Sequence, residues 1–436
     1  MDLIVLITAL IMGLLIILYK KSYSIRRVYG AVIEHSEFAR AHQVRDYGLR
    51  IFFSGLTIRL FGLAVLLASD AIQKGISRDS LKYHHIGMDI SRQMAAGFFN
   101  WPNWIDNGWF QFTGLIYYLF GTQMILIQLL NVMLGSATGV LVYRLSREVY
   151  GYESLSRFAG YVTAFFPSFI YYSILPLKDT LSLFALLFLV IALVRLRERF
   201  SPIHMFQIAF MLVVVLGLRD YLFLVCLGLV LLSMVPVSKR RVSRFVILLI
   251  GLFIFLGGIT YAFGMGFFSI EVFRSAKYFD LEYINYTRQA MNRGYGSFYD
   301  TQGISQWGQG IYSDLRNVLT SVYYFFFSID PTEVGRARQM FALPEMLFLL
   351  VGFPALIHGV LLTWREQRHK ALPVLIFAFG IMAVYGSATT NMGAMFRWRM
   401  QALPFFLLML CYGVYRRRKG VLYNLMWSIG RNRTCS

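Results

Sequence analysis

Charged residues are scarce in this chain and make up only 15% of its 436 residues. Soluble domains usually carry about a quarter of charged residues, so an ordinary water-soluble fold is excluded. Hydrophobic residues make up 57% instead, and apolar runs of near-membrane length recur between Asp2 and Tyr415. Because only short charged stretches separate these runs, we expect one membrane domain over residues 1–436.

Several signatures of soluble chemistry are also missing. The chain has no Walker-type phosphate loop, no dinucleotide fingerprint and no zinc-finger spacing. This excludes a cytosolic ATPase or nucleotide-sugar domain within the sequence. Cysteine is rare, and Cys226 and Cys411 lie inside apolar runs without metal-like spacing, so we expect them to be packing residues. The first apolar run, residues 3–18, lacks a small-residue cleavage site and is expected to be a retained anchor.

Positive charge, in contrast, is abundant, and the formal net charge is +20. Such a charge could indicate a protein that binds nucleic acid or one that contacts an anionic membrane surface. The placement of the basic residues along the chain distinguishes the two. Each basic cluster follows an apolar run, which is typical of the cytoplasmic ends of membrane helices. These clusters comprise Lys20, Lys21, Arg26, Arg27, Arg144, Arg147, Arg195, Arg197, Arg199, residues 239–241 and residues 416–419. We therefore expect membrane lipids as partners, no nucleic acid, and a multi-pass location in the cell (inner) membrane.

The apolar runs predict an all-α, polytopic transmembrane bundle of about 11 helices, with a range of about 10 to 13. The predicted crossings are residues 3–19, 51–69, 123–143, 158–172, 181–196, 205–218, 221–236, 245–263, 346–363, 372–385 and 402–415. Residues 110–121 are an alternative re-entrant or short crossing.

When successive crossings alternate in direction, every basic cluster falls on the cytoplasmic side. This threading also assigns each remaining segment to one side of the membrane. The cytoplasm receives residues 20–50, as a surface amphipathic segment, and the tail at residues 416–436. The extracytoplasmic side receives the first large loop at residues 70–107, the larger segment at residues 264–344, and the shorter segments 173–180, 219–220 and 386–399. Most polar residues of chemical interest lie on this outer side.

The first outer loop carries Asp79 and, four positions later, Tyr83. Further on, residues 164–168 read AFFPS and lead into a second outer loop with Lys178 and Asp179. This arrangement over residues 51–199 resembles the polyprenyl-phosphate-dependent glycosyltransferases of the GT-C superfamily, including the protein-mannosyltransferase-like group. In that family an acid of the first outer loop is the catalytic base, so the resemblance implies this role for Asp79.

The chemistry of such a transfer can also be matched to residue types. The acceptor hydroxyl needs a base and the departing phosphate needs cations. Asp79 is the candidate base, whereas a plain alternative is a solvated acid paired with Arg78 or Lys82. The candidate substrate-binding residues on the outer segments are Tyr83, Trp101, Trp104, Lys178, Asp179, Arg219, Arg397 and Arg399.

Two of these groups have alternative interpretations. Trp101 and Trp104 either stack on sugars or anchor the chain at the membrane interface. Asp179 is either a functional acid of the second loop or the N-cap of the following helix. The arginines at 397 and 399 lie on the outer side, against the general charge trend, which indicates ion pairing or an anionic ligand.

No cofactor is firmly predicted. His84 and His85 are adjacent, and adjacent helical side chains point about 100° apart, so they do not form a metal pair by themselves. Together with Asp89 they offer an alternative divalent-metal site.

The function that these patterns favour is transfer of a sugar from a polyprenyl-phosphate-linked donor to a glycan, lipid or protein acceptor on the extracytoplasmic face. A polysaccharide polymerase, which joins two lipid-linked oligosaccharides, is a close variant. A lipid-linked-sugar flippase is the rival of a different class, and it would show broken helices and charges at mid-membrane. A silent assembly subunit is a further alternative.

Overall fold

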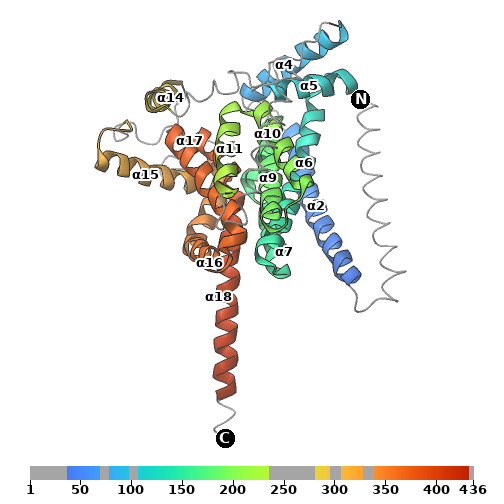
Figure 1. The fold of residues 1–436 in the computed structure, drawn as a ribbon. Coiled ribbons are helices and arrows are strands. Elements are labelled where there is room, and N and C mark those ends of the chain that lie inside the picture. The colour runs from blue at the N-terminus through green and yellow to red at the C-terminus, as the bar shows by residue number, and fades with distance from the viewer. Residues whose placement is uncertain are drawn as a thin grey trace.

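A computed structural model describes residues 37–68, 78–97, 107–234, 280–294, 306–327 and 337–431 (Figure 1). These residues form helices and contain no strand, which confirms the predicted all-α class. Four helices within them are long and apolar enough to cross a membrane, namely Tyr47–Ala68, Met124–Tyr150, Asp179–Glu198 and Leu343–Ala388. Two shorter apolar helices accompany them. The chain is thus membrane-embedded, but the count of about 11 crossings is not confirmed, and the predicted crossings 3–19 and 245–263 lie outside the described residues.

The centre of the bundle is α9 (Asp179–Glu198), which is buried along most of its length. It packs between α6 (Met124–Tyr150) and α10 (Pro202–Leu218), and α6 also packs against α2 (Glu37–Ala68). Its leucine-rich sequence favours a helix that is apolar all round, as a central membrane helix must be. The next helix, α11 (Asp220–Met234), follows α10 directly and packs against it.

The predicted crossing at residues 158–172 is not one helix. The chain forms α7 (Glu153–Ala164) and α8 (Pro167–Ser173), with a break between them. Pro167 causes the break, because proline lacks an N–H and disfavours helical geometry in the residue before it. Arg59 of α2, which is fully buried, compensates by donating to the Ala164 carbonyl at 2.8 Å and to Ser173 Oγ at 2.9 Å.

The long helix α16 (Ala337–Ala388) also has a break, at Gln367, and its first arm runs beside α18 (Leu403–Arg431). The two backbones touch. A Cβ added at Gly359 would lie 1.9 Å from the Met409 carbonyl oxygen, and one added at Gly413 would lie 2.0 Å from the Ala355 carbonyl oxygen. Glycine is therefore required at both positions for this close helix packing.

Ion pairs of basic residues gather at one end of the bundle, here called the basic end. There Arg195 pairs with Glu148 at 2.7 Å, Lys370 with Glu198 at 2.6 Å, and Arg416 with Glu366 at 2.7 Å. The opposite end, here called the loop end, carries the described parts of the predicted outer segments. The side of the membrane that each end faces stays a prediction from the positive-inside pattern.

At the loop end, α4 (Arg78–Ala95) and α5 (Gly108–Phe120) lie across the top of the bundle (Figure 1). Buried positions on α4 recur with helical spacing at Ser80, Tyr83 and Ser91, and this face packs on α5. The first outer loop is thus partly a helix that sets Asp79 in its first turn.

The larger outer segment contributes α14 (Leu281–Gly294) and α15 (Ile311–Phe326). Both dock on the end of α16, because Arg288 donates to the Ser387 carbonyl at 3.1 Å and Ser321 donates to the Gly386 carbonyl at 2.8 Å. The chain then turns into α17 (Met392–Trp398) and a short 3₁₀ helix, η5 (Arg399–Gln401). Residues 37–50 and 416–431, assigned to a surface segment and a tail, belong to α2 and α18.

Candidate functional site

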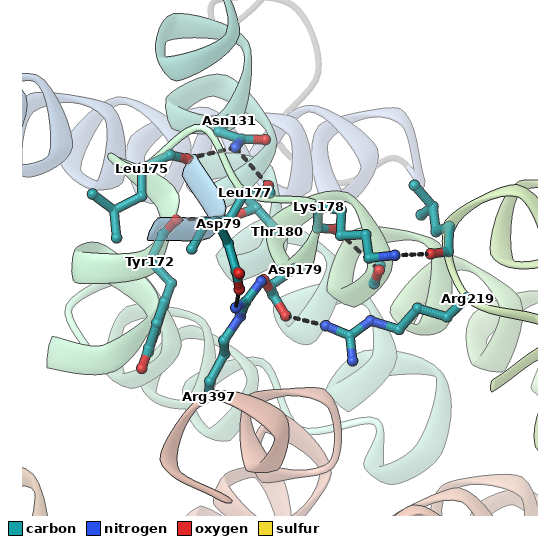
Figure 2. Close-up of polar contacts among 12 residues, drawn as sticks. Asp79, Asn131, Tyr172, Leu175, Leu177, Lys178, Asp179, Thr180, Arg219 and Arg397 are labelled. Carbon is teal, nitrogen blue, oxygen red and sulfur yellow. Dashed lines mark hydrogen bonds and ion pairs between the residues drawn. The ribbon is translucent and has the colours of Figure 1, made fainter. Parts of the chain in front are cut away.

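Four of the predicted site residues meet at the loop end of the bundle. Arg397 of α17 donates from Nη1 to Asp79 Oδ2 at 2.6 Å and from Nε to Asp179 Oδ2 at 2.7 Å. Arg219, between α10 and α11, donates from Nη2 to Asp179 Oδ1 at 2.6 Å. Figure 2 shows Arg397 reaching both carboxylates while Arg219 approaches Asp179 from another side. Positions 318 residues apart in sequence are thereby joined in one charged cluster.

Asp179 is the fixed member of the cluster. Its side chain is fully buried, and its two oxygens accept from different arginines, Arg219 and Arg397. It is also the first residue of α9, where the positive end of the helix dipole stabilises a carboxylate. The neighbouring Lys178 donates from Nζ to the Leu218 carbonyl at 2.6 Å, which ties the start of α9 to the end of α10.

The loop before Asp179 is held by two amide side chains of α6. Asn131 donates to the carbonyls of Leu175 and Leu177 at 2.7 and 2.8 Å, and Gln128 donates to the Ile174 carbonyl at 3.1 Å. Figure 2 shows the Asn131 amide beside this loop. The sequence analysis missed both residues, although two amides three positions apart within an apolar run are a recognisable signal of buried polar contacts.

Asp79 is the accessible member of the cluster. Its side chain is 50% exposed, compared with 15% for Arg397 and 0% for Asp179. It lies in the first turn of α4 and forms an ion pair with Nη1 of Arg397. A partly exposed carboxylate beside a mostly buried guanidinium is a suitable position for contact with a ligand from outside the protein.

Tyr83 lies one helical turn after Asp79 and is buried. Its ring meets that of Phe110 edge to face, with centroids 5.3 Å apart. Burial raises the pKa of Tyr83, and the charges of Arg397 and Asp179 also act on its hydroxyl. Tyr83 therefore remains protonated at neutral pH and offers a hydroxyl at the edge of the cluster.

The ion pairs of the cluster join two guanidinium groups to two carboxylates. Arg219 and Arg397 both contact Asp179, and Arg397 also contacts Asp79. Guanidinium groups suit the oxygens of a phosphate as well as those of a carboxylate.

Arg399 lies apart from this cluster. It is fully buried, donates to the carboxylate of Glu345, and donates from Nη1 to the Phe326 carbonyl at 2.8 Å. Glu345 in turn accepts from the Ser168 backbone N–H at 3.0 Å. These contacts join η5 to α15, α16 and α8, so the predicted substrate contact of Arg399 has no support in its surroundings. Sequence analysis missed Glu345, although a carboxylate at the edge of an apolar run signals a buried partner.

The residues of the alternative metal site have separate partners. His84 Nδ1 lies 2.8 Å from the Tyr117 hydroxyl, and Asp89 pairs with Arg92 at 3.4 Å. Among the described residues no group of three His, Cys, Asp or Glu side chains is placed to hold a metal ion. Burial, followed by the charge of His85, lowers the pKa of His84, so this ring is neutral at pH 7.

Trp101 and Trp104 lie outside the described residues. The cluster itself combines an accessible carboxylate, a buried carboxylate and cations, which suits proton acceptance next to an anionic group. No model of a known protein family matches the chain, and no curated protein matches it either.

Proposed function

We propose that this chain is a membrane glycosyltransferase that moves a sugar from a polyprenyl-phosphate-linked donor to a hydroxyl of a glycan, lipid or protein acceptor. The observation that carries the proposal is the contact of Arg397 with both Asp79 and Asp179. It places a candidate base next to a candidate phosphate-binding cation, which are the two groups that such a transfer needs.

The reaction takes place at the loop end, which faces the extracytoplasmic side. This assignment rests on the cations gathered at the basic end, because positively charged clusters remain in the cytoplasm. A donor with a polyprenyl chain can stay in the membrane while its phosphate and sugar reach the cluster.

In the proposed step, Asp79 accepts the proton of the acceptor hydroxyl. The acceptor oxygen forms a bond to the anomeric carbon while the bond from that carbon to the phosphate oxygen breaks. The electron pair stays on the phosphate oxygen, and Arg397 stabilises this charge. Asp179, itself fixed by Arg219, holds the Arg397 guanidinium in place. Attack from the side opposite the phosphate inverts the anomeric configuration.

A transporter of lipid-linked sugars is the second candidate, and two features favour it. Arg59 is a charged residue buried within the span Tyr47–Ala68, and the helix beside it is broken between α7 and α8. Both are typical of transporters. Against this candidate, Arg59 bonds the carbonyl that the break leaves free, which gives the residue a structural role.

Asp79→Asn separates the two candidates. We expect purified variant protein, reconstituted with membrane-extracted acceptor and a radiolabelled polyprenyl-phosphate-linked sugar, to lose about 10²- to 10⁴-fold in transfer rate, because an amide cannot accept the proton. The matched control is Glu282→Gln, which neutralises an exposed acid of α14 outside the cluster and should transfer at the wild-type rate. Wild-type transfer by Asp79→Asn would remove the proposed catalytic role. Donor movement across vesicles without any transfer would favour the transporter.

A further inference from the structure

We infer that the Asp79 carboxylate occupies the position on Arg397 that a donor phosphate takes, so that phosphate binding releases Asp79 and the donor must bind before the acceptor reacts. This inference rests on the proposed function and adds an order of binding to it. The contact that carries it is the 2.6 Å ion pair between Arg397 Nη1 and Asp79 Oδ2.

The two ion pairs of Arg397 are unequal. Asp179 is 0% exposed and is also bonded to Arg219, whereas Asp79 is 50% exposed. Solvent-exposed ion pairs contribute little because water and salt screen them, while opening a buried pair leaves an uncompensated charge. An incoming anion therefore replaces Asp79 far more easily than Asp179.

A phosphate matches the position that Asp79 would leave. Guanidinium groups bind carboxylate and phosphate oxygens with the same geometry, and a phosphate brings more acceptor oxygens. Nε of Arg397 stays on Asp179, so the guanidinium keeps its orientation while Nη1 changes partner. The helix start that carries Asp79 can remain docked, because Ser80 and Tyr83 on the same helix are buried.

The exchange alters the chemistry of Asp79. While the ion pair persists, Oδ2 of Asp79 is engaged by Nη1 of Arg397 and is not available to an acceptor hydroxyl. Once phosphate occupies Nη1, Asp79 is free to accept the acceptor proton. The phosphate oxygen that receives the electron pair of the broken glycosidic bond remains on Arg397. After the polyprenyl phosphate departs, Asp79 gives its proton to water and the ion pair forms again.

Binding of a phosphate-bearing lipid tests the exchange directly. Polyprenyl monophosphate is titrated into nanodiscs that contain the wild-type chain, Asp79→Asn, Asp79→Ser or Glu282→Gln. We expect both Asp79 variants to bind the lipid about fivefold more tightly, since no internal carboxylate competes. Glu282→Gln should bind as the wild type does, and Arg397→Gln should lose binding.

The same titration distinguishes the source of the phosphate. Inorganic phosphate is added as a competitor, and we expect it to displace the lipid only at far higher concentration. Equal competition would assign the position to free phosphate and overturn the lipid assignment. Unchanged or weaker binding by both Asp79 variants would overturn the exchange.

The two proposals fail in different ways. Loss of transfer in Asp79→Asn without tighter lipid binding removes the exchange and leaves the transferase. Tighter binding together with wild-type transfer removes the catalytic role of Asp79.

Discussion

Arg397 and Arg399 are two positions apart in sequence and have opposite surroundings. Arg397 lies in the last turn of α17 and contacts carboxylates of α4 and α9, one of which is half exposed. Arg399 begins η5, and both it and its partner Glu345 are fully buried. Residues two positions apart on a helix point about 200° apart, so the two side chains face different parts of the molecule.

The difference shows how an ion pair closed inside the protein can be told apart from one that solvent reaches. Arg399 has every contact inside the protein, including the Phe325 and Phe326 carbonyls. Arg397 shares its charge with a carboxylate that reaches solvent. The exposure of the partner, and not that of the arginine alone, separates a structural role from a functional one.

Of the substitutions that test this comparison, Arg399→Ala has the largest expected effect, a loss of stability. Removal of one partner leaves Glu345 charged and buried, and we expect a loss of about 3 to 5 kcal/mol in stability. Thermal unfolding in detergent, followed by the exposure of buried cysteines to a thiol reagent, measures it. Glu345→Gln in the Arg399→Ala background should recover part of the loss, because it removes the unpaired charge. Stability equal to the wild type would contradict the structural role.

Arg397→Ala should affect function more than stability, since Asp179 keeps Arg219. We expect transfer to fall by about 10²- to 10³-fold, as for the loss of one donor to a developing charge, and the apparent KM for the donor to rise. Initial rates over a range of donor concentrations measure both. Arg397→Lys should restore part of the rate, because an ammonium keeps the charge but lacks the planar fork. An unchanged KM in Arg397→Ala would argue against phosphate contact.

The smallest expected effect is that of pH on α4, the helix that carries Asp79. Because burial lowers the pKa of His84 in the folded chain, the unfolded chain binds a proton more readily, and stability falls as pH drops below about 6.5. Protonation of His84 opposes its burial against Tyr117 and should loosen α4 from α5. Hydrogen exchange of α4 at pH 5 and pH 8 measures this as protection factors, which correct for the intrinsic pH dependence of amide exchange, and His84→Gln is the control that removes the difference in protection. Equal protection factors in the wild type at both pH values would show that His84 does not couple α4 to pH.

Much of the architecture could be predicted from the sequence. The low charge content predicted a helical membrane protein, and the basic clusters predicted that residues 70–107 and 386–399 share one end. The contact of Asp79 with Arg397 agrees with that sidedness. Hydropathy could predict this much because it reports where whole segments lie.

Contacts between individual side chains could not be predicted from the sequence. Hydropathy averages over a run, so it hid Arg59 within the span Tyr47–Ala68 and the helix break at Pro167 that Arg59 stabilises. It also gave Arg397 and Arg399 the same interpretation, because their separation depends on the local helix geometry. Glu345 and Asn131 act through partners far away in sequence, which no local pattern encodes.

The glycine contact between α16 and α18 limits how the bundle can move. Each backbone fills the notch left by a missing side chain on the other, at Gly359 and Gly413. Axial sliding of one helix would push carbonyl groups into neighbouring atoms, so the two helices travel as one rigid body. Since α18 follows η5 and α17, Arg397 is attached to this tightly packed pair, and adjustment on ligand arrival is left to the Asp79 side chain on α4.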